Sequence, residues 1–521
     1  MKDYSFGNYI CALRTGLGLS QFQLGNLVGV SDKAVSKWEN GDAKPRIATC
    51  YRLAEVLGVN ISELLSCNTT MPARKELNKM KSKLWNEAHK RLAIYGERTP
   101  VLCWSRLAAE KAALEETDAI LNIGVLSRIA EEAEKRGSLI IEAGQMSSSF
   151  AAWLLGATKV NPLPPHYRCP KCGKTEFISL VKDGFDLPVK HCSCGVEMIR
   201  DGHNLPYDGY AKAAQAKSGV YFHVSPDFKL VAGQIIKNFY QGEADILPVQ
   251  FTDADDDLTK YTIFVVLSDR DDIPPVSKDG FWHADSAEFW YWWKDESIYE
   301  MICDDRIQKL QNLKERTKTT LPNPLEDLTP ERAETLYKQK CRGGTHTASA
   351  TQHLCAEIPH NFDLLLKLDG FTHGSGAWYD QWVHNGVEMH QSNGAKLVEE
   401  GRATLLQIPA FREDIWNDIC DALSCSGIRY NGLALEVMEN ARKGIYHGRG
   451  MPDELAVMLH SLELPEWYPE YLKNVMYLFP KCHCISLLLF DLILEWYNEK
   501  YPNEYAQVFD SKALNGLIRL F

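Results

Sequence analysis

Through the first 65 residues apolar side chains recur three or four positions apart, a spacing that predicts short amphipathic helices. Ser20 and Ser31 stand where helix N-caps are expected, and a glycine follows several of the apolar runs. The predicted helices are FGNYICALRTGLG, SQFQLGNLVG, SDKAVSKWENG, RIATCYRLAEVLG and NISELL, with Gly18, Gly29, Gly41 and Gly58 at helix ends. The pattern predicts one small core made of Phe22, Leu24, Leu27, Val28, Val30, Val35 and Trp38.

The second and third predicted helices, joined by VGV, have a helix-turn-helix pattern. From Leu19 to Pro45 the chain resembles the Cro/repressor-type (XRE) family and matches its pattern LSQxxLG…VSxxxVSKWENGxxxP. The resemblance implies that the third helix enters the major groove of double-stranded DNA and that the protein is a homodimer. By position, base edges or flanking phosphates would be faced by Lys33, Ala34, Ser36 and Lys37, and the DNA backbone would be contacted by Gln21 and Asn40.

Residues 74–91, RKELNKMKSKLWNEAHKR, predict a basic helix after this module. Leu77, Met80, Leu84 and Ala88 fall on one helical face, which leaves the basic side chains on the opposite face. Such a helix could contact the DNA backbone, form a dimer seam, or serve only as a solvated linker.

The composition is that of a soluble globular protein, with 45% hydrophobic and 24% charged residues over 521 residues. The formal net charge of −12 argues against a broadly basic surface, so nucleic-acid binding has to be local. The longest apolar run, residues 485–497, is too short to span a bilayer, and MKDYSFGNYI lacks the apolar segment of a secretory signal. We therefore expect a cytoplasmic protein without membrane contact.

Four of the 15 cysteines have the spacing of a metal site. Cys169 and Cys172 form a Cys-x-x-Cys pair, and Cys192 and Cys194 follow as a Cys-x-Cys pair beside the alternative donor His191. Two close thiolate pairs suit tetrahedral Zn²⁺, and four protein ligands leave no open position for water, which predicts a structural role. A metal-free ribbon that has lost its ion is the alternative.

The stretch VNPLPPHYRCPKC (160–172) resembles the PolC-type alpha subunit of bacterial DNA polymerase III, at the zinc-bearing insertion of its palm. The resemblance covers about residues 105–510 with large deletions. Matching segments are RGSLIIEAGQMSSSF (136–150), DILPVQFTDADD (245–256), GFTHGSGAW (370–378), ALEVMENARKG (434–444) and LPEWYPEYLKNVMYLFPKCHCISLLL (464–489). The first of these occupies the place of the family's phosphate loop, and the last two belong to the helical fingers.

Phosphoryl transfer in this family requires two metal ions held by three carboxylates, two of which form an Asp-x-Asp pair on one strand. If SGVYFHVSPDF (218–228) is that strand, Phe222 and Val224 occupy the acid positions; otherwise the strand has been deleted. Ile263 takes the place of the third acid. Other acids nearby could have taken over the role, although solvated surface positions explain them better: Asp227, Asp269, Asp271 and Asp272. No catalytic residue is therefore assigned, and Mg²⁺ is expected only if polymerase activity persists.

The phosphate loop also departs from the family pattern. Gly144, Ser148 and Ser149 persist, whereas Ala143 replaces an arginine and Glu142 adds a negative charge that would repel a triphosphate. The sequence therefore predicts impaired nucleotide binding.

These patterns predict a multidomain, mainly α-helical protein with α+β parts. The expected divisions are a helix-turn-helix domain (1–67), a basic helical linker (68–100), a palm-like segment with the degenerate phosphate loop (101–160), a zinc-ribbon insertion (161–210), a palm remnant (211–300) and a helical fingers-like region (301–521).

Three functions fit the sequence. The first is a non-catalytic, sequence-specific DNA-binding protein that regulates transcription or modulates replication, with a PolC-like body that contacts primer-template DNA or replisome proteins. The second is an active DNA polymerase with relocated acids. The third is a plain dimeric repressor whose body serves only in dimerisation.

Overall fold

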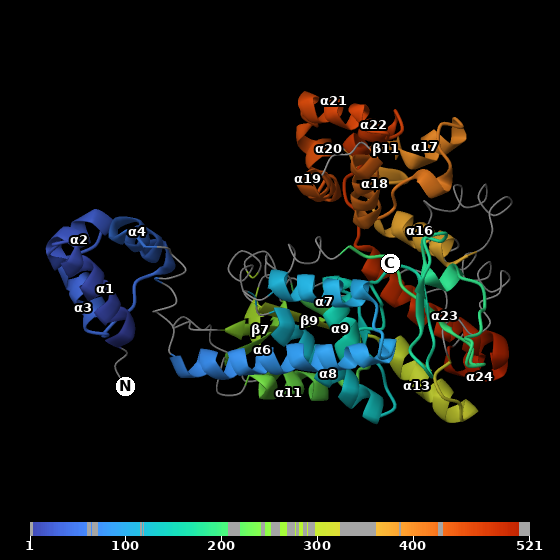
Figure 1. Ribbon diagram of the computed structural model, residues 1–521, viewed down its shortest axis with the longest axis horizontal. Coiled ribbons are helices and arrows are strands. Elements are labelled where there is room, and N and C mark those ends of the chain that lie inside the picture. Colours follow the sequence, from blue (N-terminus) through green and yellow to red (C-terminus); the bar gives the residue numbers. More distant parts are fainter. Residues whose placement is uncertain are drawn as a thin grey trace. The chain divides into compact units, whose positions relative to one another are not determined.

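The computed structural model describes residues 4–59, 64, 71–114, 117, 119–206, 219–240, 245–251, 261–267, 277, 281–284, 289, 297–322, 361–384, 387–425 and 431–509. The chain divides into two compact units, Met1–Ser82 and Lys83–Phe521, and the helix α6 (Met71–Arg91) runs across this division. Figure 1 labels the elements of both units. Among the described residues, no helix combines the length and the apolar character needed to cross a bilayer.

The first unit contains the predicted helix-turn-helix. Its helices are α1 (Tyr4–Gly16), α2 (Gln21–Val28), α3 (Asp32–Glu39) and α4 (Ile47–Leu57); of the predicted fifth helix only Leu64 lies within the described residues. Ser20 and Ser31 are confirmed as N-caps, since their hydroxyls accept from the amides of Gln23 and Ala34. The predicted core is wrong at two positions: Phe22 is 62% exposed and Leu27 is 57% exposed, because α2 turns Leu24 and Val28 inward instead.

The second unit begins with helices and is built around a mixed sheet. Its first helical elements are the end of α6, η1 (Leu92–Tyr95), α7 (Val101–Leu114) and α8 (Ala119–Lys135). The sheet runs β1-β5-β9-β7-β6-β8; β5 and β9 are parallel, as are β6 and β8, and the other neighbours are antiparallel. The strands are β1 (Ile141–Glu142), β5 (Val220–Val224), β6 (Asp245–Phe251), β7 (Tyr261–Leu267), β8 (Trp282–Ala284) and β9 (Ser297–Cys303).

The two faces of the mixed sheet have different neighbours. One face packs on α8 and α11 (Lys229–Phe239), which Figure 1 labels beside the sheet. The Tyr299 hydroxyl donates to Asn122 Oδ1 at 2.6 Å, and the ring of Phe264 lies under Gly233. Because side chains alternate along a strand, Phe222 and Val224 share this face with Tyr299 and Phe264. We call the opposite face, which carries Tyr221, His223, Glu300 and Ile263, the open face.

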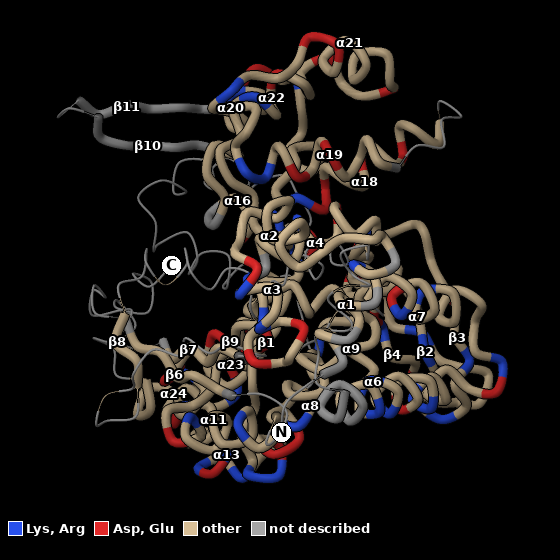
Figure 2. The backbone as a smooth tube through the Cα atoms, turned by 90° about the vertical axis from the view of Figure 1, so that its left-hand side faces the viewer, with Lys and Arg blue, Asp and Glu red and all other residues tan. Residues whose placement is uncertain are grey.

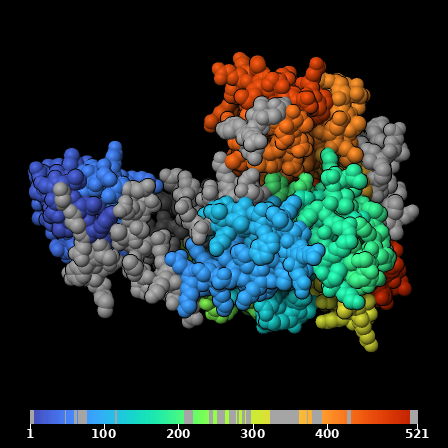
Figure 3. Space-filling view, viewed as in Figure 1, coloured from blue at the N-terminus to red at the C-terminus, as the bar shows by residue number. Residues whose placement is uncertain are grey.

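A small three-stranded sheet forms a separate lobe at residues 161–206, with order β3-β2-β4. Its strands are β2 (His166–Arg168), β3 (Thr175–Phe177) and β4 (Ile199–Asp201), and η3 (Gly184–Asp186) lies between the last two. Figure 3 shows this lobe in green beside the light blue surface of α6 and α7. The lobe is where the predicted zinc ribbon falls in the sequence.

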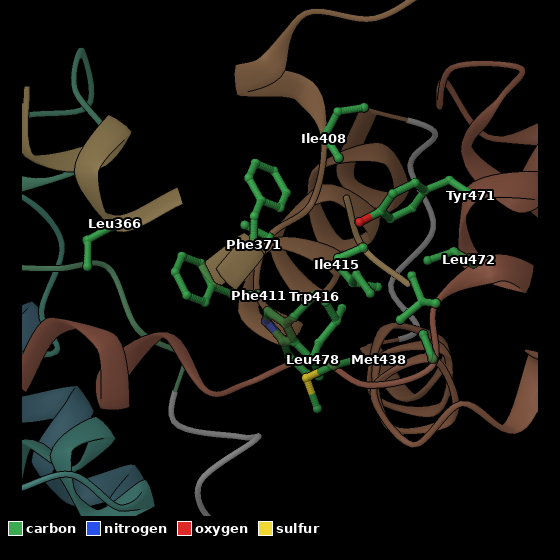
Figure 4. Close-up of a cluster of buried hydrophobic side chains, with 14 of the residues drawn as sticks. Leu366, Phe371, Ile408, Phe411, Ile415, Trp416, Met438, Tyr471, Leu472 and Leu478 are labelled. Atoms are coloured by element: carbon green, nitrogen blue, oxygen red, sulfur yellow. The ribbon is translucent and has the colours of Figure 1, made fainter. Parts of the chain in front are cut away.

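The C-terminal part is helical and has the largest core of the described chain. Phe411, Ile415, Trp416 and Met438 converge there, as Figure 4 shows. Its elements are α13 (Asp305–Thr317), α16 (Phe362–His373), β10 (Tyr379–His384), β11 (Val387–Ser392), α17 (Gly394–Glu399), η5 (Leu405–Gln407), α18 (Arg412–Cys425), α19 (Asn431–Arg442), α20 (Ile445–Arg449), α21 (Asp453–Ser461), α22 (Tyr468–Asn474), α23 (Lys481–Lys500) and α24 (Pro502–Val508). The chain is thus multidomain and mainly helical, with one mixed sheet and one small lobe.

Candidate nucleic-acid interface and metal centre

The third helix presents a polar face to solvent. α3 turns Val35 and Trp38 into the module core, where Trp38 is only 6% exposed. Lys33 and Lys37, one turn apart, are exposed, and Ser36 between them is partly exposed. Residues four apart lie on the same side of a helix, so these two ammonium groups can face one DNA strand together.

Two other residues of the predicted DNA contacts, Asn40 and Ala34, differ in their exposure to solvent. Asn40 is exposed at the C-cap of α3, and its side-chain amide lies 3.4 Å from the Ser36 hydroxyl. Ala34 is partly buried and packs against the module core, so only part of its methyl group remains for a DNA contact.

Gln21 is held inside the module by a buried ion pair. Its amide donates to Glu39 Oε2 at 2.7 Å, while Arg14 donates to the same carboxylate through Nε at 2.5 Å and Nη2 at 2.9 Å. Burial opposes the charge of Glu39, but the hydrogen bonds from Arg14 and Gln21 outweigh it, and the pKa of Glu39 is lowered. The carboxylate therefore ties α1, α2 and α3 together.

The basic helix predicted at residues 74–91 lies within α6. Figure 2 shows lysine and arginine recurring along it. Trp85 and Ala88 are buried, whereas Lys83, Lys90 and Arg91 are exposed. The described part of this helix therefore has one packed face and one basic, solvated face.

The four predicted metal ligands come together in the three-stranded lobe. The sulfurs of Cys169, Cys172, Cys192 and Cys194 all lie within 4.8 Å of one another. The Sγ atoms of Cys169 and Cys194 are 3.4 Å apart, and those of Cys172 and Cys192 are 3.6 Å apart. A Zn²⁺ ion with Zn–S bonds of about 2.3 Å would separate neighbouring sulfurs by about 3.8 Å in a tetrahedron, so the cluster has the size that zinc requires.

Each cysteine pair sits on a tight turn whose amides point at sulfur. Gly173 and Gly195, which follow the two pairs, have φ angles of 71° and 85°, a region that favours glycine. The amide of Cys172 donates to the Cys169 sulfur and lowers its pKa to about 6, and the amide of Cys194 lowers the pKa of Cys192. Amide donors favour the thiolate form, which is the form that binds metal.

One cysteine turn is packed against the segment that follows α6. A side chain at Gly173 would meet the backbone nitrogen of Gly96 at 2.2 Å, so the two backbones touch directly. The turn thereby fixes the chain between the basic helix and α7.

The positions predicted to correspond to the three catalytic acids do not share one face of the mixed sheet. Phe222 and Val224, proposed above as stand-ins for an Asp-x-Asp pair, lie on the helix-covered face and are fully buried. Tyr221 and His223 occupy the open face of β5 instead. Ile263 is on the open face, buried among Leu247, Val249 and Ile298.

One acid does lie on the open face, and the sequence reasoning missed it. Glu300 of β9 is paired in register with Tyr221 of β5 and Ile263 of β7. Burial raises the pKa of Glu300 to about 7. The sequence feature that could have identified Glu300 is a single acidic residue within the otherwise mainly apolar strand SIYEMIC. Glutamate is rarely buried unless it has a partner.

His223 belongs to a second charged group at the end of β5. Its Nδ1 lies 3.1 Å from Asp304 Oδ2, and Arg306 donates to the same carboxylate. Burial opposes the charge of Asp304, yet the hydrogen bonds from His223 and Arg306 lower its pKa. These contacts connect the end of β5 to the start of α13, and the Asp304 carboxylate is bound by both His223 and Arg306.

Asp227 is exposed in the turn that precedes α11, and Asp269, Asp271 and Asp272 lie outside the described residues. Within the described ranges, the four-cysteine cluster is the only group of three or more His, Cys, Asp or Glu side chains close enough to share a metal ion.

The predicted phosphate loop forms a strand, a 3₁₀ turn η2 (Gln145–Ser148) and a short helix α9 (Phe150–Leu155). Ser148 and Ser149 are buried, and the Ser149 hydroxyl accepts from Ala152 as the N-cap of α9. The Gly144 amide donates to the Glu142 carboxyl at 2.8 Å. Gly144 and Ser149 therefore make hydrogen bonds inside the protein, whereas the buried Ser148 hydroxyl has no hydrogen-bond partner within the described part of the chain.

Comparison with known proteins supports the two resemblances noted in the sequence, one at the N-terminus and one over most of the chain. Residues 12–64 match the family model described as Helix-turn-helix. DNA polymerase III PolC-type of Lacticaseibacillus paracasei is 26% identical over 488 residues, covering 80% of this chain and 32% of the relative. The enzymes of the same name from Bacillus cereus and Staphylococcus aureus are 26% and 24% identical, covering 81% and 88% of this chain.

The chain joins a helix-turn-helix module to a PolC-like region. It spans about a third of the length of the PolC-type relatives that it matches.

Proposed function

We propose that this chain is a sequence-specific DNA-binding protein whose PolC-like body does not polymerise DNA, and that it regulates transcription or modulates DNA replication. The observation that carries the proposal is the make-up of the open face. Tyr221, His223 and Ile263 stand beside Glu300, where metal-dependent phosphoryl transfer would need further carboxylates. Neither an apolar nor an aromatic side chain can supply the anionic oxygens that Mg²⁺ prefers.

The helix-turn-helix module supplies the binding to double-stranded DNA. Lys33, Ser36, Lys37 and Asn40 share the solvent side of α3, with Ala34 at its edge, and are the proposed DNA-contacting residues. The exposed basic side of α6 is a further candidate for phosphate contacts. One module presents few positive charges, so we propose a homodimer that reads two half-sites. Gln21 is partly exposed and donates to Glu39 through its side-chain amide, and it is a further proposed contact to the DNA backbone.

The cysteine cluster is proposed to hold a structural Zn²⁺ through Cys169, Cys172, Cys192 and Cys194. Its four sulfurs complete a tetrahedral set, which stabilises the lobe and leaves no ligand position for a reacting water. The His191 side chain is exposed and is not part of the cluster. Through the contact of Gly173 with Gly96, the metal would also stabilise the segment that follows the basic helix.

A second candidate function, DNA polymerase activity, is favoured by Glu300. Glu300 lies on β9 in the open face, a position from which a carboxylate could bind a catalytic metal ion. This candidate requires other carboxylates to join it, and among the described residues Glu300 belongs to no group of three or more His, Cys, Asp or Glu side chains close enough to share an ion.

The experiment begins by selecting duplexes that bind the full-length protein from a random library. Binding to the selected site, to a random duplex and to a primed template is then measured at several salt concentrations. Replacing Lys33 and Lys37 with alanine should weaken binding to the selected site and reduce the salt slope by about 2. The matched control replaces Lys396 and Lys473, two partly exposed lysines of the helical body, and removes the same net charge.

Equal loss in both variants would contradict a DNA-reading role for α3. Tight binding to the primed template that survives the Lys33 and Lys37 changes would show that the body contributes its own DNA contact. No preference for the primed template over a random duplex would favour the plain repressor, whose body serves only in dimerisation.

A further inference from the structure

The phosphate loop of this chain is filled by one of its own side chains. Glu142, the last residue of β1, is 3% exposed and folds back over the turn that follows it. Its Oε1 accepts the Gly144 amide at 2.8 Å, and its Oε2 accepts the Ser147 hydroxyl. A phosphate group in such a loop would use the same kinds of donor, backbone amides and hydroxyls.

The space above the loop glycine shows the same filling. Glycine in a phosphate loop lets the ligand approach the backbone closely, because it has no Cβ atom. A Cβ atom built at Gly144 would lie 2.8 Å from Oε1 of Glu142. The carboxyl group therefore occupies the space that the glycine leaves open.

The Ser147 hydroxyl and the first amides of α9 are also used internally. The Ser147 hydroxyl lies 2.9 Å from that of Thr158 and 3.2 Å from that of Ser486 on α23. At the start of α9, Glu110 accepts the amides of Phe150 at 2.8 Å and Ala151 at 3.0 Å. Two carboxyl groups of the protein thus accept four hydrogen bonds from donors of the kind that an anionic ligand would use, while the buried Ser148 hydroxyl has no hydrogen-bond partner among the described residues.

Among the described residues, Glu142 forms no ion pair with a cation. Burial raises the pKa of Glu142 to about 7, against the hydrogen bonds from Ser147 and Gly144 that lower it. His483 of α23 is nearby, but its Nδ1 donates to the Ala143 carbonyl at 2.7 Å. In either protonation state the group fills the same volume, so the loop stays occupied.

We propose that the Glu142 side chain is a built-in occupant of the phosphate loop and keeps the loop closed to phosphate groups. The inference rests on the proposed loss of polymerase function, and it explains how the loop can persist without a nucleotide. Removing the carboxyl group should leave a cavity lined by the Gly144 amide and the Ser147 hydroxyl, which a free phosphate ion can enter.

The test is chemical rescue of Glu142→Ala by inorganic phosphate in the full-length protein. Thermal unfolding is followed in sodium phosphate and in sodium chloride of equal ionic strength. We expect the Ala variant to melt below wild type in chloride and to regain about 2 °C or more in phosphate, since a ligand bound only by the folded state raises the melting temperature. Wild type and the control Glu131→Ala, a surface change on α8, should show only the general, unsaturable stabilisation that phosphate gives to folded proteins, and the gain of Glu142→Ala is counted beyond theirs.

Glu142→Gln separates the lost volume from the lost charge. Its amide oxygen can still accept from Gly144, so this variant should show no phosphate effect. The proposal is overturned if Glu142→Ala responds to phosphate no more than wild type does, or if wild type itself shows a saturable response. If Glu142→Ala does not fold in chloride, refolding in phosphate replaces melting as the readout, and failure to recover folded protein also overturns it.

These outcomes are separate from the test of the proposed function. A wild-type protein that binds phosphate but extends no primer would remove this inference alone. Loss of operator binding in the Lys33 and Lys37 variant has no bearing on the phosphate response.

Discussion

Replacing Glu39 with alanine should destabilise the helix-turn-helix module. The change removes the carboxylate that accepts from Arg14 and Gln21, and so disconnects α3 from α1 and α2. Arg14 remains behind with a side chain that is only 11% exposed, and its charge has lost its partner.

The expected magnitude follows from the type of interaction that is broken. Removing one partner of a buried ion pair costs about 3–5 kcal/mol, because the other charge stays buried. The module is small and the pair lies close to its surface, so we expect the lower end, about 3 kcal/mol. Because the pKa of Glu39 is lowered in the folded state, its stabilising effect is present above the carboxyl's unfolded-state pKa and is lost as the pH falls through the folded value.

Hydrogen–deuterium exchange of the full-length protein provides the local readout. Peptides from α1 and α3 should exchange at least 100-fold faster in Glu39→Ala at neutral pH, which corresponds to about 3 kcal/mol, while peptides from α18 and α23 should be unchanged. After correction for the slower intrinsic exchange at low pH, acidification should reduce the protection factors of these peptides in wild type and have less effect on those of the variant. Exchange within threefold of wild type at neutral pH would refute the idea that this ion pair stabilises the module.

Two further changes test the metal centre and the open face. Cys169→Ser should reduce bound zinc, measured by elemental analysis, from about one ion per chain to a small fraction and expose the lobe to proteolysis; a variant that keeps full zinc content would contradict the assignment. Glu300→Gln should remove one component of the dependence of stability on pH: with a pKa of about 7, Glu300 contributes most to the stability of wild type at low pH, and up to about 3 kcal/mol of this contribution is lost as the pH rises to and through 7, at about 1.4 kcal/mol per pKa unit. Identical urea midpoints of the two proteins at pH 5 and pH 8 would show that Glu300 does not titrate in this range.

Features set by short sequence patterns could be predicted. Serine caps, glycines at helix ends and cysteine spacing each depend on only a few neighbouring residues, and the structure places the Ser20 and Ser31 caps and the four sulfurs as expected. The assignment of the helix-turn-helix needed no tertiary information, because its turn and caps are local.

Features set by the faces of the sheet could not be predicted reliably. Whether Phe222 or Tyr221 points to the open face depends on how β5 pairs with β9. That register cannot be derived from the sequence of β5 alone, because it also depends on the neighbouring strand. The exposure of Phe22 and Leu27 has a similar origin, since helical periodicity places residues on a face without deciding where the neighbouring helices end. The hydrogen bond from the Gly144 amide to the Glu142 carboxyl group depends on a tight turn between two residues that are close in sequence. The pattern of apolar residues does not predict such a turn.

The most direct test of the account is primer extension by the purified full-length protein with a primed template, all four dNTPs and Mg²⁺. The account predicts no template-dependent product, for wild type and for Glu300→Gln alike. Extension by wild type that Glu300→Gln abolishes would show that this carboxyl holds a catalytic metal ion, and would contradict the claim that the PolC-like body has lost polymerisation.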